Sequence, residues 1–259
     1  MKESENDWRM RDVTFVGKDW HNPWTGKMVP EGTQITVVSI IPLSKKKQLT
    51  IAVPNATALC LNISKRSWQE AKEIRKASKI DAISKSKPSF NSHSDSFDYI
   101  EKVMESVVMA YTSLEAFANE IIPDDYEYAC NRKSKVILEI MDKKEIERWK
   151  SLDEKLKTII PEVLEITSPA GTACWQGYVN LKRIRDRIIH MKNEDRKSSG
   201  IDTPTLWHDL FKIRSPFIQA KDIIDFYVKH HYCPDVKSNK FNWLRISSSG
   251  IVFLQSVRA

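Results

Sequence analysis

The residues with the clearest chemical potential lie in one stretch, LKRIRDRIIHMK, at positions 181–192. It carries Arg185 and His190 five positions apart, with Asp186 directly after the arginine. A guanidinium stays charged and can bind phosphate, while an imidazole titrates near neutral pH and can move a proton. This combination suits chemistry on a phosphodiester.

The reaction that these groups suit best is cleavage of RNA by its own 2′-hydroxyl. Histidine can remove the hydroxyl proton or protonate the leaving 5′-oxygen, while arginine stabilises the charged phosphorane. The reaction requires no metal and no cofactor, and no second or third carboxylate or histidine accompanies Asp186 at ligand spacing. We therefore expect Asp186 to orient Arg185 or His190 by hydrogen bonding. The neighbouring cations are expected to bind substrate phosphates: Lys182, Arg183 and Arg187.

Arg185 and His190 do not share one face of a regular helix. Five residues separate them by roughly 140° around the axis and by about 7.5 Å along it. The side chains can approach each other if the helix ends near His190, which the following sequence NEDRKSSG favours. A two-fold dimer is the other solution, because two adjacent copies of the helix bring two such pairs to one cleft.

The same residues also have a plainer interpretation. A basic helix face can simply be solvated, with His190 placed favourably at the negative end of the helix dipole. An arginine followed by a histidine at this spacing arises by chance about once in a chain of this composition. The surroundings of the motif therefore carry the argument.

Those surroundings are helical. Between residues 97 and 121, apolar residues recur at spacings of three and four, which predicts one long core helix. Its Glu115 and Asn119 lie one turn apart, where they either support a site or partner helix or form a solvated pair. A second amphipathic helix is expected over 146–160, opened by a capping box at Asp142 and ended by Pro161. The motif helix is expected from about Thr172, and two more helices over 205–212 and 216–232.

Both ends of the chain have the composition of strands. Residues 13–16, 35–41, 49–53 and 56–63 are rich in Val, Ile and Thr and predict a small antiparallel sheet. The segment ITVVSII is apolar on both faces, so its strand is expected to lie centrally or under a helix. Residues 243–246 and 251–254 predict a hairpin, which should pair with the N-terminal sheet or dock on the bundle because a lone hairpin is marginal in water.

The predicted fold is mainly α, an antiparallel helical bundle with a small N-terminal β-sheet and a C-terminal β-hairpin. The β-rich appendage should cover 1–66. A helix opened by the capping box of Ser67 and Glu70, with a mobile Ser/Lys/Pro-rich linker, should cover 67–96. The bundle should cover 97–236 and the hairpin 237–259.

Composition narrows the class of partner and the compartment. Lys and Arg number 41 against 34 acidic residues, giving a net charge of +7, which favours a polyanionic partner. The N-terminus is too polar for a signal peptide, and no apolar run approaches the roughly 18 residues of a membrane helix. We therefore expect a cytoplasmic protein without a membrane partner. The four cysteines are far apart, which indicates neither zinc nor disulfides.

With these residues in view, the chain resembles the HEPN superfamily (higher eukaryotes and prokaryotes nucleotide-binding). The family motif places Arg, then Asn, Asp or His, then three or more residues and His near the end of a bundle helix, and Arg185, Asp186 and His190 fit it. The segments YTSLEAFANE at 111–120 and LDEKLK at 152–157, and a helix led by Trp175, are also similar to such proteins. The resemblance covers residues 97 to 232.

The resemblance implies a helical bundle that forms homodimers across the motif helices. It also implies metal-independent cleavage of RNA that leaves a 2′,3′-cyclic phosphate, with Arg185 and His190 catalytic and Asp186 supporting. Many members are toxin or phage-defence ribonucleases, so an antitoxin or another regulatory protein is an expected partner. Other members are non-catalytic dimerisation or nucleotide-binding modules, which is the alternative function here.

Overall fold

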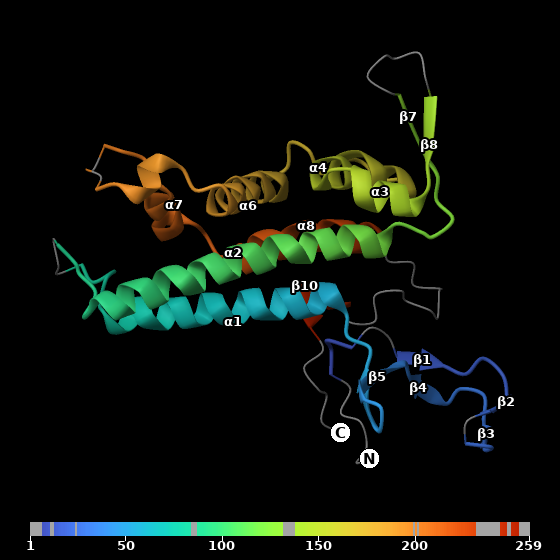
Figure 1. Cartoon of the computed structure of the whole chain (residues 1–259). Coiled ribbons are helices and arrows are strands. Elements are labelled where there is room, and N and C mark those ends of the chain that lie inside the picture. The colour runs from blue at the N-terminus through green and yellow to red at the C-terminus, as the bar shows by residue number, and fades with distance from the viewer. Residues whose placement is uncertain are drawn as a thin grey trace. The chain divides into compact units, whose positions relative to one another are not determined.

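The computed structural model describes residues 7–10, 13–23, 25–83, 87–131, 138–198, 200, 202–231, 244–247 and 250–253. The chain is mainly helical with small antiparallel sheets (Figure 1). It divides into two compact units. The strand unit consists of Met1–Leu59 and Tyr232–Ala259, and the helical unit consists of Cys60–His231.

The strand unit contains paired short strands. These are β1 (Val13–Phe15) with β4 (Gln34–Thr36), β2 (Trp20–His21) with β3 (Met28–Val29), β5 (Val38–Ser44) with β6 (Lys47–Ala52), and β9 (Leu244–Ser247) with β10 (Gly250–Phe253). Every sheet formed by the described residues has two strands, so the C-terminal hairpin is present but its strands pair only with each other.

The predicted burial of ITVVSII is wrong. The segment is divided between β4 and β5, and β5 is exposed along its whole length, with Ile40 at 61% and Leu43 at 61% of full exposure. The cause is pairing: β5 makes a hairpin with β6 alone among the described strands, so nothing in that sheet makes it central.

The strand predicted over 56–63 is also wrong, because these residues open helix α1 (Ala56–Ala77). Asn55 follows a proline, and its side-chain oxygen accepts the backbone N–H of Ala58 at 2.8 Å, which caps the first turn. The predicted helix start at Ser67 lies inside α1, where the Ser67 hydroxyl donates to the Ile63 carbonyl at 2.9 Å. Local capping therefore outweighs the β-like composition of this segment.

Helix α2 (His93–Ile121) is the long core helix that the apolar spacing predicts. Ser92 caps it by accepting the Asp95 N–H at 3.0 Å, so the helix begins inside the predicted linker. Val103, Val107, Leu114 and Phe117 are all fully buried. Of the predicted linker, residues 84–86 lie outside the described residues.

Four helices of the helical unit lie side by side and run in alternating directions (Figure 1): α1, α2, α6 (Ala173–Ile189) and α8 (Pro216–His231). Ser64 of α1 and Ser106 of α2 are joined by a buried hydrogen bond of 3.1 Å. The Phe117 ring of α2 lies 6.0 Å from that of Tyr227 on α8. Helix α7 (Leu206–Lys212) connects α6 to α8.

The single helix predicted over 146–160 is wrong, because the chain leaves helical geometry at Lys150 and Ser151. Helix α3 (Lys143–Trp149) precedes this break, and a continuous helical run follows it, made of α4 (Leu152–Glu154), a π-helix (Lys155–Ile159) and α5 (Ile160–Leu164). The capping box at Asp142 is present, but Ser151 caps a new helix by accepting the Glu154 N–H at 3.2 Å. Pro161 lies in the first turn of α5 and does not end a helix.

A hairpin of β7 (Tyr128–Asn131) and β8 (Leu138–Met141) precedes these turns and is absent from the sequence-based expectation. Among the described residues, the helices are each too short or too polar to cross a membrane.

Candidate functional site

The motif helix α6 has well-defined ends. Thr172 caps its start by accepting the Trp175 N–H at 3.3 Å, and Tyr178, Leu181, Ile184 and Ile188 form its buried face. Its last residue is followed by His190, which leaves helical geometry at φ −116° and ψ 58° while its N–H still donates to the Asp186 carbonyl at 2.9 Å. The helix therefore ends at the motif histidine, and His190 is exposed.

Arg185 lies over the ring of a tyrosine on the neighbouring helix. Its guanidinium carbon is 3.6 Å from the ring centroid of Tyr111, close enough for a cation–π contact. Its NH1 atom is 2.9 Å from the Asp186 carboxylate. Its Nε atom is buried and has no hydrogen-bond partner among the described residues, while the side chain as a whole is 24% exposed.

A polar network continues from Arg185 into the bundle. Lys155, from the π-helix, is buried and donates to the Asn119 side-chain oxygen at 2.9 Å and to the Glu147 carbonyl at 3.1 Å. Its Nζ atom lies 3.8 Å from the Glu115 carboxylate. Burial lowers the pKa of Lys155 and raises the pKa of Glu115, while the charges of Lys155 and Arg185 partly oppose the shift of Glu115.

Glu115 and Asn119 therefore share a partner on another element. The sequence left two interpretations, a pair that supports a site or partner helix and a solvated pair. A purely solvated pair does not describe their contacts, since both side chains face the ammonium of Lys155. Their support of a functional site stays a prediction.

The predicted phosphate-binding cations are engaged in ion pairs. Lys182 lies 2.5 Å from Asp153, which also accepts a hydrogen bond from Tyr178, and the bond to Asp153 raises the pKa of Lys182. Arg183 makes two hydrogen bonds to the Asp209 carboxylate, at 2.6 and 2.9 Å. These pairs connect α6 to α4 and to α7.

Arg187 pairs with Asp195, whose side chain is fully buried, through contacts of 2.8 and 3.2 Å. Asp195 also accepts the backbone N–H groups of Leu206 at 2.7 Å and Lys192 at 3.0 Å. Burial alone would raise the pKa of Asp195, but hydrogen bonds from Arg187 and the two N–H groups lower it to about 2. This carboxylate anchors the turn that follows the motif.

The structure thus brings Arg185 and Asp186 into direct contact and places His190 at the end of the helix. Three further residues of the site were missed from sequence: Tyr111, Lys155 and Asp153. All three fall in segments that the HEPN resemblance quotes, but neither the resemblance nor the apolar spacing of residues 97–121 assigned them a role in the site. Within the described ranges, no group of three or more His, Cys, Asp or Glu residues is arranged to hold a metal ion.

The fold and the site define a mainly helical protein with an Arg-Asp-His group at the end of a bundle helix. A scan against models of protein families, a search of curated proteins and a search of solved structures each gave no match. The likeness to HEPN proteins therefore depends on the quoted residues alone.

Proposed function

We propose that the chain is a metal-independent RNA endonuclease of the HEPN type, acting at a site composed by two copies of the chain. The observation that carries the proposal is the state of Arg185. Its guanidinium is held at the side of the motif helix by Tyr111 and Asp186, yet its buried Nε lacks a partner among the described residues. An unsatisfied buried donor costs about 1–3 kcal/mol, which favours a rearrangement that gives it a phosphate oxygen.

In this proposal His190 acts as the general base or acid. Its position at the exposed helix end lets the imidazole reach the 2′-hydroxyl or the leaving 5′-oxygen of a bound strand. Arg185 stabilises the negative charge that develops on phosphorus, and Asp186 holds the guanidinium in orientation.

A second copy is proposed because of the outer face of α6. Val179 is 43% exposed and Ile189 is 55% exposed, and both lie on the side of the helix that also carries Asp186. Packing α6 against its equivalent would cover these apolar side chains and bring the two Arg185 and His190 pairs to one groove.

The proposal is tested with Arg185→Ala and His190→Ala, assayed on single-stranded RNA in EDTA. Each variant should lose at least about 10²-fold in cleavage rate, and wild-type products should end in a 2′,3′-cyclic phosphate. Arg196→Ala and His93→Ala are matched controls, since both residues are exposed and lie outside the motif helix. Cleavage at the wild-type rate by both motif variants would remove the assignment.

The second candidate is a non-catalytic dimerisation or nucleic-acid-binding module. The observation that favours it is that Lys182, Arg183 and Arg187 hold α6 to its neighbours, as they would on a purely structural helix. This function predicts salt-sensitive binding of RNA with no product at any enzyme concentration.

A further inference from the structure

A row of lysines follows one face of α1, a different helix from the one that carries the motif. Lys65, Lys72 and Lys76 lie at helical spacings of seven and four, and Lys79 follows in the turn after the helix. All four are exposed. Lys65 and Lys76 are separated by about 16 Å along the axis, so the cations form an extended row.

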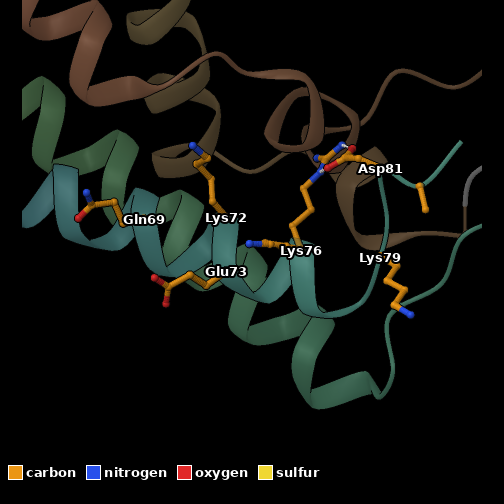
Figure 2. Close-up of a pocket in the computed structure, with 8 residues that line it drawn as sticks. Gln69, Lys72, Glu73, Lys76, Lys79 and Asp81 are labelled. Atoms are coloured by element: carbon orange, nitrogen blue, oxygen red, sulfur yellow. Dashed lines mark hydrogen bonds and ion pairs between the residues drawn. The ribbon is translucent and has the colours of Figure 1, made fainter.

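The last three lysines line a cleft of about 590 Å³, here called the lysine cleft. Figure 2 shows Lys72 and Lys76 on α1 and Lys79 on the turn that follows it. The cleft is lined by Gln69, Lys72, Glu73, Arg75, Lys76, Lys79, Asp81 and Ala82.

Arg75 and Asp81 neutralise each other within the wall of the lysine cleft. The guanidinium makes contacts of 2.6, 2.8 and 3.0 Å with the Asp81 carboxylate and also donates to the Phe211 carbonyl at 3.2 Å. With this pair set aside, the lining has three lysines against Glu73, a net charge of +2. The cleft is therefore built to attract an anion.

An aromatic hollow of about 360 Å³ adjoins the lysine cleft and shares Lys72, Arg75 and Asp81 with it. Its remaining lining is apolar: Trp68, Ala71, Tyr99, Phe211 and Ile213. Tyr99 and Phe211 are stacked with centroids 4.8 Å apart, and Trp68 is half-buried. Tyr99 is buried, so the rings that lie beside the cations with surface open to a ligand are those of Phe211 and Trp68, both half-buried.

We propose that the lysine cleft and the aromatic hollow together bind single-stranded RNA, with the lysines on the phosphates and one unstacked base in the hollow. A basic groove beside aromatic rings is the combination that single strands require. A single nucleotide would use the hollow but leave Lys65, at the far end of the row, without a phosphate. This proposal rests on the proposed function in taking RNA as the substrate. It adds a second surface that contacts the strand, separate from Arg185 and His190.

Helix α7 connects this surface to the motif helix. Phe211 lines the aromatic hollow, while Asp209, two residues earlier on the same helix, holds Arg183 of α6. A strand in the hollow therefore touches the element that fixes α6, which makes the surface suitable for positioning RNA at the motif.

The test uses a fluorescent 2′-O-methyl oligoribonucleotide, which binds but cannot be cleaved, and fluorescence anisotropy over a range of salt. Single-strand affinity falls with salt at a slope of about −0.7 for each phosphate contact, so Lys72→Ala with Lys76→Ala should reduce the slope by about 1.4 and weaken binding about 25-fold at 0.1 M salt. The matched control is Lys144→Ala with Lys157→Ala, which removes the same charge from two exposed residues outside the cleft.

Trp68→Leu should weaken binding about fivefold or more while leaving the salt slope unchanged, because it removes stacking and no charge. Circular dichroism confirms that the variant is folded before it is measured. Equal binding by wild type and the Lys72, Lys76 variant, or an equal loss in the control pair, would overturn the proposal. Full competition by AMP would also overturn it, in favour of a site for a mononucleotide.

The two proposals fail separately. If wild-type protein leaves ordinary RNA intact but the binding pattern holds, the ribonuclease assignment fails and the RNA surface stands. If RNA is cleaved but the lysine pairs behave alike, the RNA surface alone is wrong.

Discussion

Asp195 is the residue whose removal should most disturb the region after the motif. Its side chain is fully buried and receives hydrogen bonds from Arg187 and from the backbone of Leu206 and Lys192. The partners come from α6, from the turn after His190 and from the first residue of α7. We predict that Asp195→Ala destabilises the protein more than any nearby surface change.

The magnitude follows from what the substitution leaves behind. Removing one partner of a buried ion pair costs about 3–5 kcal/mol, and each unsatisfied buried N–H costs about 1–3 kcal/mol. These costs overlap, because the groups share one site and can rearrange together. We therefore expect a loss of about 4 kcal/mol in the free energy of unfolding for Asp195→Ala. Asp195→Asn, which keeps one acceptor oxygen, should lose about half of that.

Urea denaturation followed by circular dichroism measures the effect, with the slope against urea expected to stay constant. Glu194→Ala is the control, since Glu194 is the exposed neighbouring carboxylate and should change stability by no more than about 0.5 kcal/mol. Equal stability of Asp195→Ala and Glu194→Ala would refute the reasoning.

Acid provides an independent check of the same pair. The pKa of Asp195 is lowered in the folded protein from 3.8 to about 2, so its stabilising contribution is complete above about pH 4 and lost as the pH falls toward 2. The stability difference between wild type and Asp195→Asn should therefore shrink over that interval, and a constant difference would contradict the assigned contacts.

Three further predictions concern the site. Tyr111→Phe should keep the ring beneath Arg185 and preserve cleavage of RNA, whereas Tyr111→Leu removes a cation–π contact of about 1–2 kcal/mol and should slow cleavage roughly tenfold in the same assay. Lys155→Met should lower the free energy of unfolding in urea by about 2 kcal/mol, since it leaves the Asn119 side-chain oxygen and the Glu147 carbonyl without their donor; a change below about 0.5 kcal/mol would contradict the buried network. Mixing Arg185→Ala with His190→Ala should restore part of the cleavage if each groove uses one residue from each copy, and no recovery after subunit exchange would argue against a shared site.

Sequence periodicity predicted α2 and α6 well because both helices bury a regular apolar stripe. It failed where local contacts decide the outcome. Ala56 to Ile63 has the composition of a strand, but the Asn55 cap makes it helical. The region after Asp142 has helical spacing throughout, but Ser151 starts a new helix, and Lys155 is buried on the same face as Leu152, Leu156 and Ile159.

The candidate site was predictable only in part, for a physical reason. The motif identified Arg185, Asp186 and His190 by type and spacing, and the end of the helix at His190 follows from the polar sequence after it. The platform under Arg185 was not predictable, because Tyr111 is 74 residues away and its contact depends on how α2 packs against α6. Nor could the pattern indicate that Lys182, Arg183 and Arg187 form ion pairs with carboxylates from other elements.

The basic residues of α6 differ in their partners, and this difference supports a chemical role for Arg185. Lys182, Arg183 and Arg187 each meet a carboxylate from another element, so α6 is held in place by α4, α7 and the turn at Asp195. The ion pair of Arg185 is with Asp186 of its own helix, and its guanidinium also lies over the ring of Tyr111 on α2. Among these described cations it is the one whose ion pair joins no second element, so turning its guanidinium toward a phosphate would break no ion pair between elements, although it would give up the contact with the Tyr111 ring. A fixed helix with one cation that can exchange its partner is what charge stabilisation in a transition state requires.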